Sequence, residues 1–137
     1  MTTIATDGES MAGDSLTTAG GDVWFYGPKV HRAADGSIFG ACGPAASAQR
    51  FKRFMVEGGE WPALADEFCA LVLTLDGNAF WIDKDNERVP MALPAAVGSG
   101  DNFAIGAMLA GASPLDAVKI ATTRDTRSGG DVAVIAR

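Results

Sequence analysis

The sequence is poor in several residue types that small proteins use to hold themselves together or to bind ligands. Its two cysteines, Cys42 and Cys69, are too few for a disulfide framework and fit no metal-ligand spacing. Its one histidine, His31, excludes a metal site with two histidine ligands. No apolar run reaches the roughly eighteen residues that a transmembrane helix needs. Eleven basic residues against seventeen acidic ones give a net charge of −6, which argues against nucleic acid or an anionic membrane as a partner.

The chain does have enough apolar material for a core. Its 137 residues are 47% hydrophobic and 20% charged, a composition typical of one globular domain, which we expect to span residues 1–137. At this length folding hides roughly two thirds of the unfolded surface, so a core can form without metal or disulfides. The first residues lack the basic head and apolar core of a signal peptide. We therefore expect a soluble, cytoplasmic protein whose cysteines are small buried apolar residues.

The first third of the sequence alternates strand patterns with turn signals. Short β-branched and aromatic runs, separated by Asp-Gly and Gly-Pro pairs, predict strands over 2–6, 10–13, 23–26, 29–33 and 37–42. Later runs of the same kind predict strands over 71–75, 79–82, 91–97 and 131–135. Because turns this short join neighbouring strands, the pairing is expected to be mainly antiparallel.

Helical patterns lie between these groups of strands. Residues 44–57 place apolar side chains (Phe51, Phe54, Met55) on one face and basic ones (Arg50, Lys52, Arg53) on the other. Further helices are predicted over 61–70, 101–110 and 113–123, the last begun by Ser113-Pro114. The order of strands, two helices, strands, two helices and a strand predicts an α+β fold. We expect a four-layer αββα sandwich of two mainly antiparallel sheets, flanked by helix pairs.

Few residues in the body of the chain point to chemistry. His31 stands beside Arg32 in a predicted strand, which favours a surface or packed imidazole. The glycine-rich stretches spell neither a Walker nor a dinucleotide-binding motif. The sequence therefore predicts no metal site and no cofactor.

The start of the chain is more informative. Thr2 follows Met1, and an initiator methionine before a small residue is normally removed, so we expect Thr2 to become the first residue. A free Thr2 combines a hydroxyl nucleophile with an α-amine whose pKa is about 7.7–8.0. Such an amine can act as the general base for its own hydroxyl, directly or through water.

Several further motifs, taken together in their order, resemble proteasome β-subunits and the bacterial HslV peptidase. They are Met1-Thr2-Thr3-Ile4, Ala12-Gly13-Asp14, Pro28-Lys29-Val30, Gly43 before Ala45-Ala46, Val97-Gly98-Ser99-Gly100 and Arg124-Asp125-Thr126-Arg127-Ser128-Gly129-Gly130. The resemblance covers nearly the whole chain. It implies the αββα fold of the N-terminal-nucleophile hydrolases, which agrees with the fold predicted from the strand and helix patterns alone.

The resemblance also implies a role for each matching catalytic position. Thr2 supplies nucleophile and base, and Lys29 lies beside its hydroxyl, where an ammonium favours the developing alkoxide. Asp14 holds Lys29 charged and oriented. The backbone N–H of Gly43 donates to the oxyanion. A further group of residues surrounds the α-amine and tunes its protonation: Ser99, Asp125 and Ser128.

Substrate-binding positions follow from the same resemblance. Thr18 and Ala45 are expected to bind an extended substrate strand through their backbones. Thr17, Ala41 and Ala45 are expected to line the pocket for the side chain that precedes the scissile bond. Because Ala41 and Ala45 are small, we expect this pocket to take bulky apolar side chains.

Three departures from the family pattern bear on assembly and activity. The separation of Thr2 from Asp14 is shorter than usual, so the first hairpin is expected to be clipped. Pro44 and Ser47 stand where the family usually has glycine and aspartate. The sequence also ends at Arg137, just after one strand, without the closing elements of larger relatives.

The residues and the resemblance together predict a threonine-type endopeptidase that cleaves unfolded polypeptides inside a self-compartmentalising homo-oligomer of one or more rings. An ATP-dependent unfoldase is a partner by analogy alone. Two alternatives stay open: a catalytically silent assembly or binding subunit with the same fold, and an amidase acting on a small substrate. An active enzyme is favoured over a silent subunit because six catalytic positions are kept together: Thr2, Asp14, Lys29, Ser99, Asp125 and Ser128.

Overall fold

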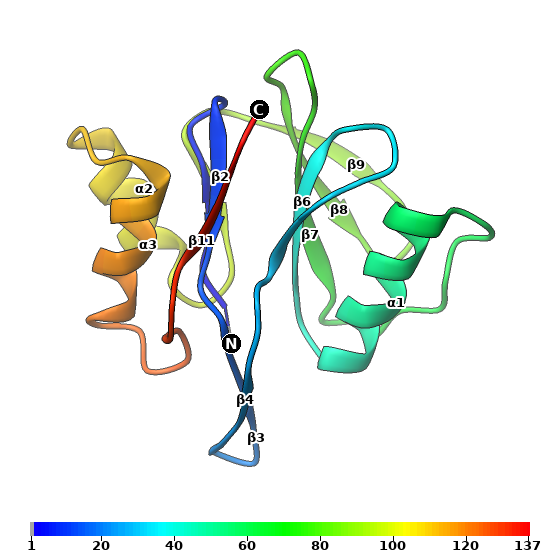
Figure 1. Ribbon diagram of the computed structural model, residues 1–137, viewed down its shortest axis with the longest axis horizontal. Helices are drawn as coiled ribbons and strands as arrows, with labels where there is room; N and C mark the ends of the chain where they lie inside the picture. Colours follow the sequence, from blue (N-terminus) through cyan, green and yellow to red (C-terminus); the bar gives the residue numbers. More distant parts are fainter. Residues whose placement is uncertain (1) are drawn as a thin grey trace.

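Two antiparallel sheets face each other in the computed structural model, which describes residues 2–137 (Figure 1). The first sheet has the order β10-β1-β2-β11. Its strands are β1 (Ile4–Thr6), β2 (Ser10–Gly13), β10 (Ala95–Val97) and β11 (Ala133–Ala136). The β1–β2 hairpin turns at the predicted Asp7-Gly8 pair, and β1 is the inner strand that pairs with both β2 and β10. The N-terminal strand is therefore fixed on both edges.

The second sheet has the order β5-β6-β7-β8-β9 and is a meander of consecutive antiparallel strands. Its strands are β5 (Val30–Arg32), β6 (Ile38–Cys42), β7 (Cys69–Leu73), β8 (Ala79–Asp83) and β9 (Arg88–Met91). The main core lies between the two sheets. Its buried members are Ile4, Met11, Val30, Ile38, Cys42, Leu71, Leu73, Ala79, Ala95 and Val97.

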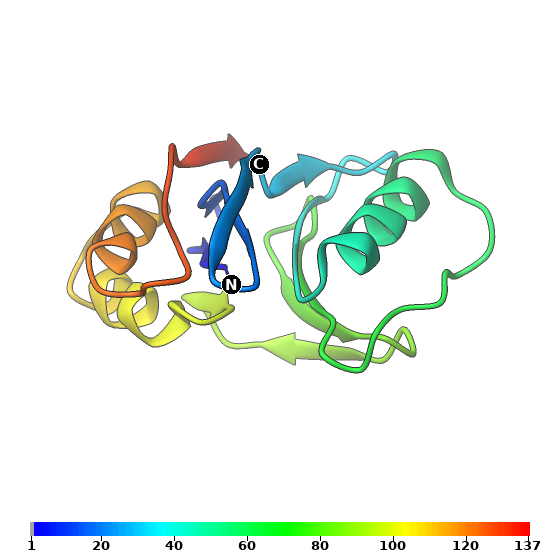
Figure 2. The same cartoon turned by 90° about the horizontal axis from the view of Figure 1, so that it is seen from below.

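Helices cover the outer faces of both sheets (Figure 2). Helices α2 (Asp101–Leu109) and α3 (Pro114–Thr122) lie on the first sheet, where mainly alanine side chains let them pack closely. Ser113 caps α3, as predicted, by accepting a hydrogen bond from the Asp116 N–H at 3.1 Å. Helix α1 (Ala45–Glu57) lies on the second sheet and buries Phe51 against an aromatic cluster. The predicted αββα architecture of two antiparallel sheets is confirmed.

One predicted helix is wrong. Residues 61–68 form no helix but an extended loop before β7, so α1 alone covers the second sheet. Residues of this loop form hydrogen bonds and packing contacts with distant parts of the chain. The Trp61 Nε1–H donates to the carbonyl oxygen of Lys84 at 2.6 Å, the Ala65 N–H donates to Ser47 Oγ at 3.0 Å, and Phe68 is buried against Phe51. These contacts override the local preference for helix.

Two strand predictions also change. The run 91–97 belongs to two strands, because β9 ends at Met91 in the second sheet and β10 begins at Ala95 in the first. Pro94, which has no N–H to donate, lies in the crossing segment between them. The sequence patterns also missed β3 (Leu16–Ala19), which pairs with β4 (Asp22–Tyr26) in a separate hairpin that projects from the sandwich beside the N-terminus (Figure 1).

The cysteines are free thiols that face each other across β6 and β7, with Cys42 buried and Cys69 half-buried. Within residues 2–137, every helix is too short or too polar to cross a membrane.

Candidate active site

Thr2 lies directly before β1, at the end of the first sheet that is next to the β3–β4 hairpin (Figure 1). Thr2 as a whole is only 4% exposed. The turn after β10 holds its backbone, because the Gly100 N–H and the Ser99 hydroxyl both approach the Thr2 carbonyl oxygen at 3.4 Å. Met1, whose removal the sequence predicts, lies outside the described residues.

The Thr2 hydroxyl meets a buried ion pair. Lys29 Nζ donates to Thr2 Oγ1 at 3.1 Å and to the two carboxylate oxygens of Asp14 at 3.0 and 3.1 Å. The Lys29 side chain is 12% exposed and that of Asp14 is fully buried. Asp14 follows β2 and Lys29 precedes β5, so the two sheets each supply one member of the pair. The ammonium thus lies next to the hydroxyl oxygen, where it favours the alkoxide form.

The Asp14 carboxylate is fully hydrogen-bonded despite its burial. Besides Lys29 it accepts the N–H groups of Thr3 at 3.0 Å, Leu16 at 3.3 Å and Gly129 at 3.0 Å. A buried charge is tolerated when it is paired and its remaining lone pairs are satisfied. Asp14 therefore ties together the start of β1, the start of β3 and the segment that precedes β11.

A second cluster of polar side chains lies next to the Thr2 nitrogen. Ser99 Oγ lies 3.2 Å from the Thr2 nitrogen and 2.6 Å from Asp125 Oδ2, and the Ser128 hydroxyl also donates to Asp125. Burial raises the pKa of Asp125, but the hydrogen bonds from Ser128 and Ser99 outweigh it and leave that pKa below its usual value. The Asp125 carboxylate is accordingly ionised at neutral pH. The structure brings all three residues together around the position that the sequence motifs indicated.

Gly98 is required by the close approach of the Thr2 backbone. Its φ is +101°, and a Cβ at this position would overlap the Thr2 carbonyl oxygen. Gly111 is a matched control, because its φ is +109° but an added Cβ would meet nothing.

We predict that Gly111→Ala costs about 1–2 kcal/mol of stability through backbone strain alone. Gly98→Ala is expected to cost a further 1–3 kcal/mol, roughly, because of the overlap. Chemical denaturation of the two variants checks this. Equal losses for the two would show that the Thr2 backbone is not held as tightly as described.

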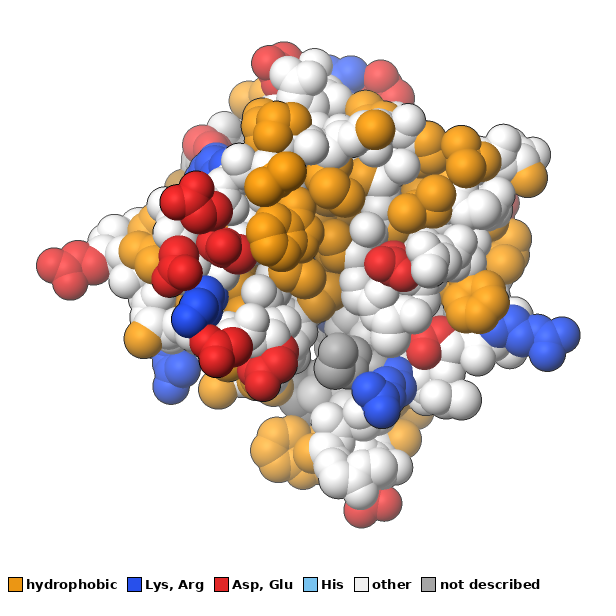
Figure 3. All heavy atoms as spheres, turned by 180° about the vertical axis from the view of Figure 1, so that it is seen from behind, with side chains coloured by type: hydrophobic (Ala, Val, Ile, Leu, Met, Phe, Trp, Pro, Cys, Tyr) orange, Lys and Arg blue, Asp and Glu red, His pale blue; other side chains and the backbone are white. Residues whose placement is uncertain are grey.

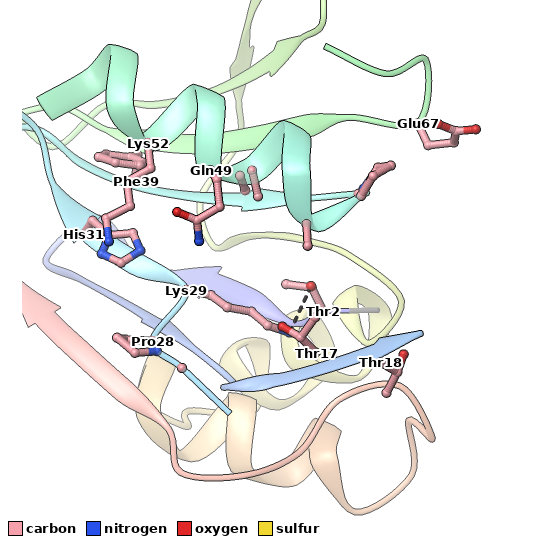
Figure 4. Close-up of a pocket in the computed structure, with 16 residues that line it drawn as sticks. Thr2, Thr17, Thr18, Pro28, Lys29, His31, Phe39, Gln49, Lys52 and Glu67 are labelled. Carbon is pink, nitrogen blue, oxygen red and sulfur yellow. Dashed lines mark hydrogen bonds between the residues drawn. The ribbon is translucent and has the colours of Figure 1, made fainter. Parts of the chain in front are cut away.

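A cavity of about 280 Å³ opens beside Thr2, and Gly43 lies on its wall (Figure 4). Gly43 has φ +113°, a conformation that favours glycine, and it precedes α1. The four predicted substrate-binding residues all line this cavity. They are Thr17 and Thr18 from β3, Ala41 from β6 and Ala45 from α1. The structure thus brings together the hydroxyl, the glycine and the four substrate-binding positions at one opening.

Among the polar residues on the cavity wall that sequence reasoning did not place there are His31, Gln49 and Lys52. His31 was expected at the surface or packed, and it is half-buried with its ring 5.6 Å from that of Phe39, as a packed imidazole would be. Lys52 was expected on the outer face of its helix with Arg50 and Arg53, and it is half-buried against the cavity.

A periodicity signal could have found these residues. His31 is two residues after Lys29 in extended chain, and residues at that spacing share a face. Gln49 and Lys52 follow Ala45 by four and seven positions, which places all three on one helix face. The backbone N–H of Thr3, which donates to Asp14, was also missed.

Solved structures share this architecture. BPH from Thiobacillus denitrificans aligns with a TM-score of 0.76 at 20% identity, over 99% of this chain and 96% of that chain. BPH from the same organism in complex with epoxomicin aligns at 0.70 and 18% identity, over 99% and 97%. HslV from Trypanosoma brucei aligns at 0.69 and 21% identity, over 98% and 97%. No protein-family model and no curated protein matches the sequence.

These likenesses cover nearly the whole chain at high TM-scores, so they define its fold. The chain has the proteasome-like fold of HslV, as the sequence motifs indicated.

Proposed function

We propose that the protein is a threonine-type endopeptidase whose nucleophile is the hydroxyl of Thr2, exposed as the first residue by removal of Met1. One observation carries the proposal. Thr2 Oγ1 lies 3.1 Å from the ammonium of Lys29, which a fully buried Asp14 holds in place, at the mouth of a cavity. A buried ion pair costs desolvation and is weak evidence for stability, so its position against a hydroxyl favours a chemical role.

The chemistry that these groups support is acyl transfer. The free α-amine of Thr2 takes the proton from Oγ1, and Oγ1 attacks the carbonyl carbon of the scissile peptide bond. The resulting tetrahedral intermediate collapses as the amine returns the proton to the departing nitrogen, leaving an ester on Thr2. Water, deprotonated by the same amine, then attacks the ester and regenerates the hydroxyl. Lys29 stabilises the alkoxide character of Oγ1 in both steps.

The Thr2 amine needs a polar setting in which it can gain and lose a proton. Ser99 and Asp125 supply it, because Ser99 Oγ lies between the Thr2 nitrogen and the Asp125 carboxylate, and Ser128 hydrogen-bonds the same carboxylate. The Gly43 N–H is the proposed donor to the oxyanion, a contact typically worth about 3–4 kcal/mol of transition-state stabilisation.

We further propose that the substrate is an unfolded polypeptide bound in extended form. Thr18 in β3 and Ala45 at the start of α1 border the cavity from opposite sides, which supports main-chain pairing of a substrate strand between them. Such pairing reads the backbone and so accepts many sequences.

Assembly into a ring-forming homo-oligomer is part of the proposal. Apolar side chains gather on one face of the chain (Figure 3). Trp24, Phe103 and Leu109 are among the large apolar residues that are exposed in the single chain, with Leu109 at 71% and Trp24 at 67%. Exposed apolar groups of this size favour contacts with further subunits. An unfoldase partner rests on analogy with HslV alone.

Intact mass spectrometry combined with a digestion assay tests the proposal. We expect the purified protein to lack Met1 and to degrade an unfolded polypeptide such as reduced, alkylated casein. A protein that lacks Met1, is correctly folded and leaves the polypeptide intact would contradict peptidase activity. Retained Met1 would favour a silent assembly subunit, because a blocked amine cannot act as the base.

A further inference from the structure

The cavity beside Thr2 has polar side chains on its wall, besides the small residues that the sequence analysis expected there. The Lys52 side chain extends from α1 toward His31 on β5, and Gln49 points into the space between α1 and Lys29 (Figure 4). Lys52 is close enough to His31 that its charge, after the larger effect of burial, lowers the pKa of the imidazole. At neutral pH His31 is therefore mainly uncharged, and Lys52 supplies the positive charge on this part of the wall.

The wall also carries small and apolar residues. Ala41, Ala45 and Ala48 are small, and Phe39 and Pro28 add apolar surface. A wall that combines methyl groups with the donors of Gln49 and Lys52 suits a side chain with an aliphatic stem and a polar tip.

The charged side chains around the cavity favour binding of an anionic group near Lys52. Within residues 2–137, Lys52 forms no salt bridge with a carboxylate, whereas the carboxylate of Asp14 is already bound by Lys29. Glu67 is the acidic residue on the cavity wall. It is exposed and lies at the opposite end from Lys52 and His31 (Figure 4). An acidic side chain near Lys52 would face donors without facing another carboxylate.

We propose that this cavity selects glutamate as the residue before the scissile bond, with Lys52 and Gln49 donating to its carboxylate and the alanines contacting its methylene groups. The proposal rests on the endopeptidase function proposed above and names its preferred substrates. It differs from the expectation of bulky apolar side chains, which rested on the small size of Ala41 and Ala45, because Lys52 also lines the cavity.

Three fluorogenic peptides that differ only in the residue before the leaving group test the proposal: glutamate, its uncharged isostere glutamine, and leucine. A charge-assisted hydrogen bond predicts that kcat/KM for the glutamate peptide exceeds that for the glutamine peptide by about ten- to a hundredfold. Equal or faster cleavage of the glutamine or leucine peptide would overturn the proposal while leaving the peptidase function intact.

Lys52→Met keeps the aliphatic stem and removes the charge, and Arg53→Met, on the exposed side of the same helix, is its matched control. We expect Lys52→Met to abolish the preference for glutamate, so that the ratio of kcat/KM for the glutamate and glutamine peptides falls to about one. Arg53→Met should keep the preference. An equal loss on all three peptides in Lys52→Met would show a structural role and overturn the assignment.

Binding separates this proposal from the peptidase function itself. The affinities of the glutamate and glutamine peptides for the Thr2→Ala variant, measured by calorimetry, do not depend on catalysis. Tighter binding of the glutamate peptide supports the proposal even if the wild-type protein cleaves none of the three. Equal affinities would overturn it whatever the wild-type protein cleaves.

Discussion

Thr2→Ala is expected to abolish peptide cleavage, lowering kcat by a factor on the order of 10⁴ to 10⁶, which is the range for removal of a nucleophile that acts as part of a unit. The physical reason is that Oγ1 is the atom that attacks, and the ammonium that favours its alkoxide form, that of Lys29, lies 3.1 Å from it. Initial rates on a fluorogenic peptide, with active-site titration of the wild type, measure the loss.

Two controls make this result specific. Thr2→Ser keeps a hydroxyl and an amine in one residue and should keep a measurable rate. Thr2→Ala itself should fold, because it removes a small side chain and a hydrogen bond from the Lys29 ammonium, a contact worth about 1.5–3 kcal/mol. A folded Thr2→Ala protein that cleaves as fast as the wild type would show that another group is the nucleophile.

Asp14→Asn is expected to cost about 3–5 kcal/mol of stability, because it leaves the largely buried Lys29 ammonium without its charge partner. The two carboxylate oxygens also accept the N–H groups of Thr3, Leu16 and Gly129. An asparagine replaces one of these oxygens by an NH₂ donor, so at least one of these N–H groups loses its acceptor. At this chain length the loss corresponds to a melting temperature lower by roughly 10–15 °C. Differential scanning calorimetry or thermal unfolding followed by circular dichroism measures it.

The surface pair Lys84–Asp66 provides the matched control. Its side chains are 40% and 86% exposed, so Asp66→Asn is expected to leave the melting temperature nearly unchanged. Asp14→Asn should also slow cleavage, because an uncharged residue no longer fixes Lys29 against Thr2. Similar melting temperatures for the two variants would contradict the prediction that breaking the buried Asp14–Lys29 pair destabilises the fold.

Local patterns were sufficient for most of the fold. Ser113-Pro114 gave the start of α3, and the Asp7-Gly8 turn gave the β1–β2 hairpin, because capping and turn geometry depend on neighbours in the sequence. The local pattern predicts a helix over 61–70, but no helix forms, because the hydrogen bond from Trp61 to Lys84 and the packing of Phe68 on Phe51 depend on distant segments. Such contacts leave no periodic trace in the sequence.

The candidate site divides in the same way. The order of short motifs located Thr2, Asp14 and Lys29, and the structure places the Lys29 ammonium within hydrogen-bond distance of both Thr2 and Asp14. Lys52 and His31 carry no motif, and only the packing of α1 over β5 brings them to one cavity. The expectation of bulky apolar side chains rests on the small Ala41 and Ala45, whereas the proposed preference for glutamate rests on Lys52, which the structure adds to the cavity wall.

The most direct test of the central claim is intact mass spectrometry after incubation with a peptide epoxyketone, followed by mapping of the modified peptide. We predict one adduct per chain, on Thr2, in protein that lacks Met1, and none on Thr2→Ala. A folded protein that lacks Met1 and gains no mass, or an adduct that maps to any residue other than Thr2, would contradict the assignment of Thr2 as the nucleophile.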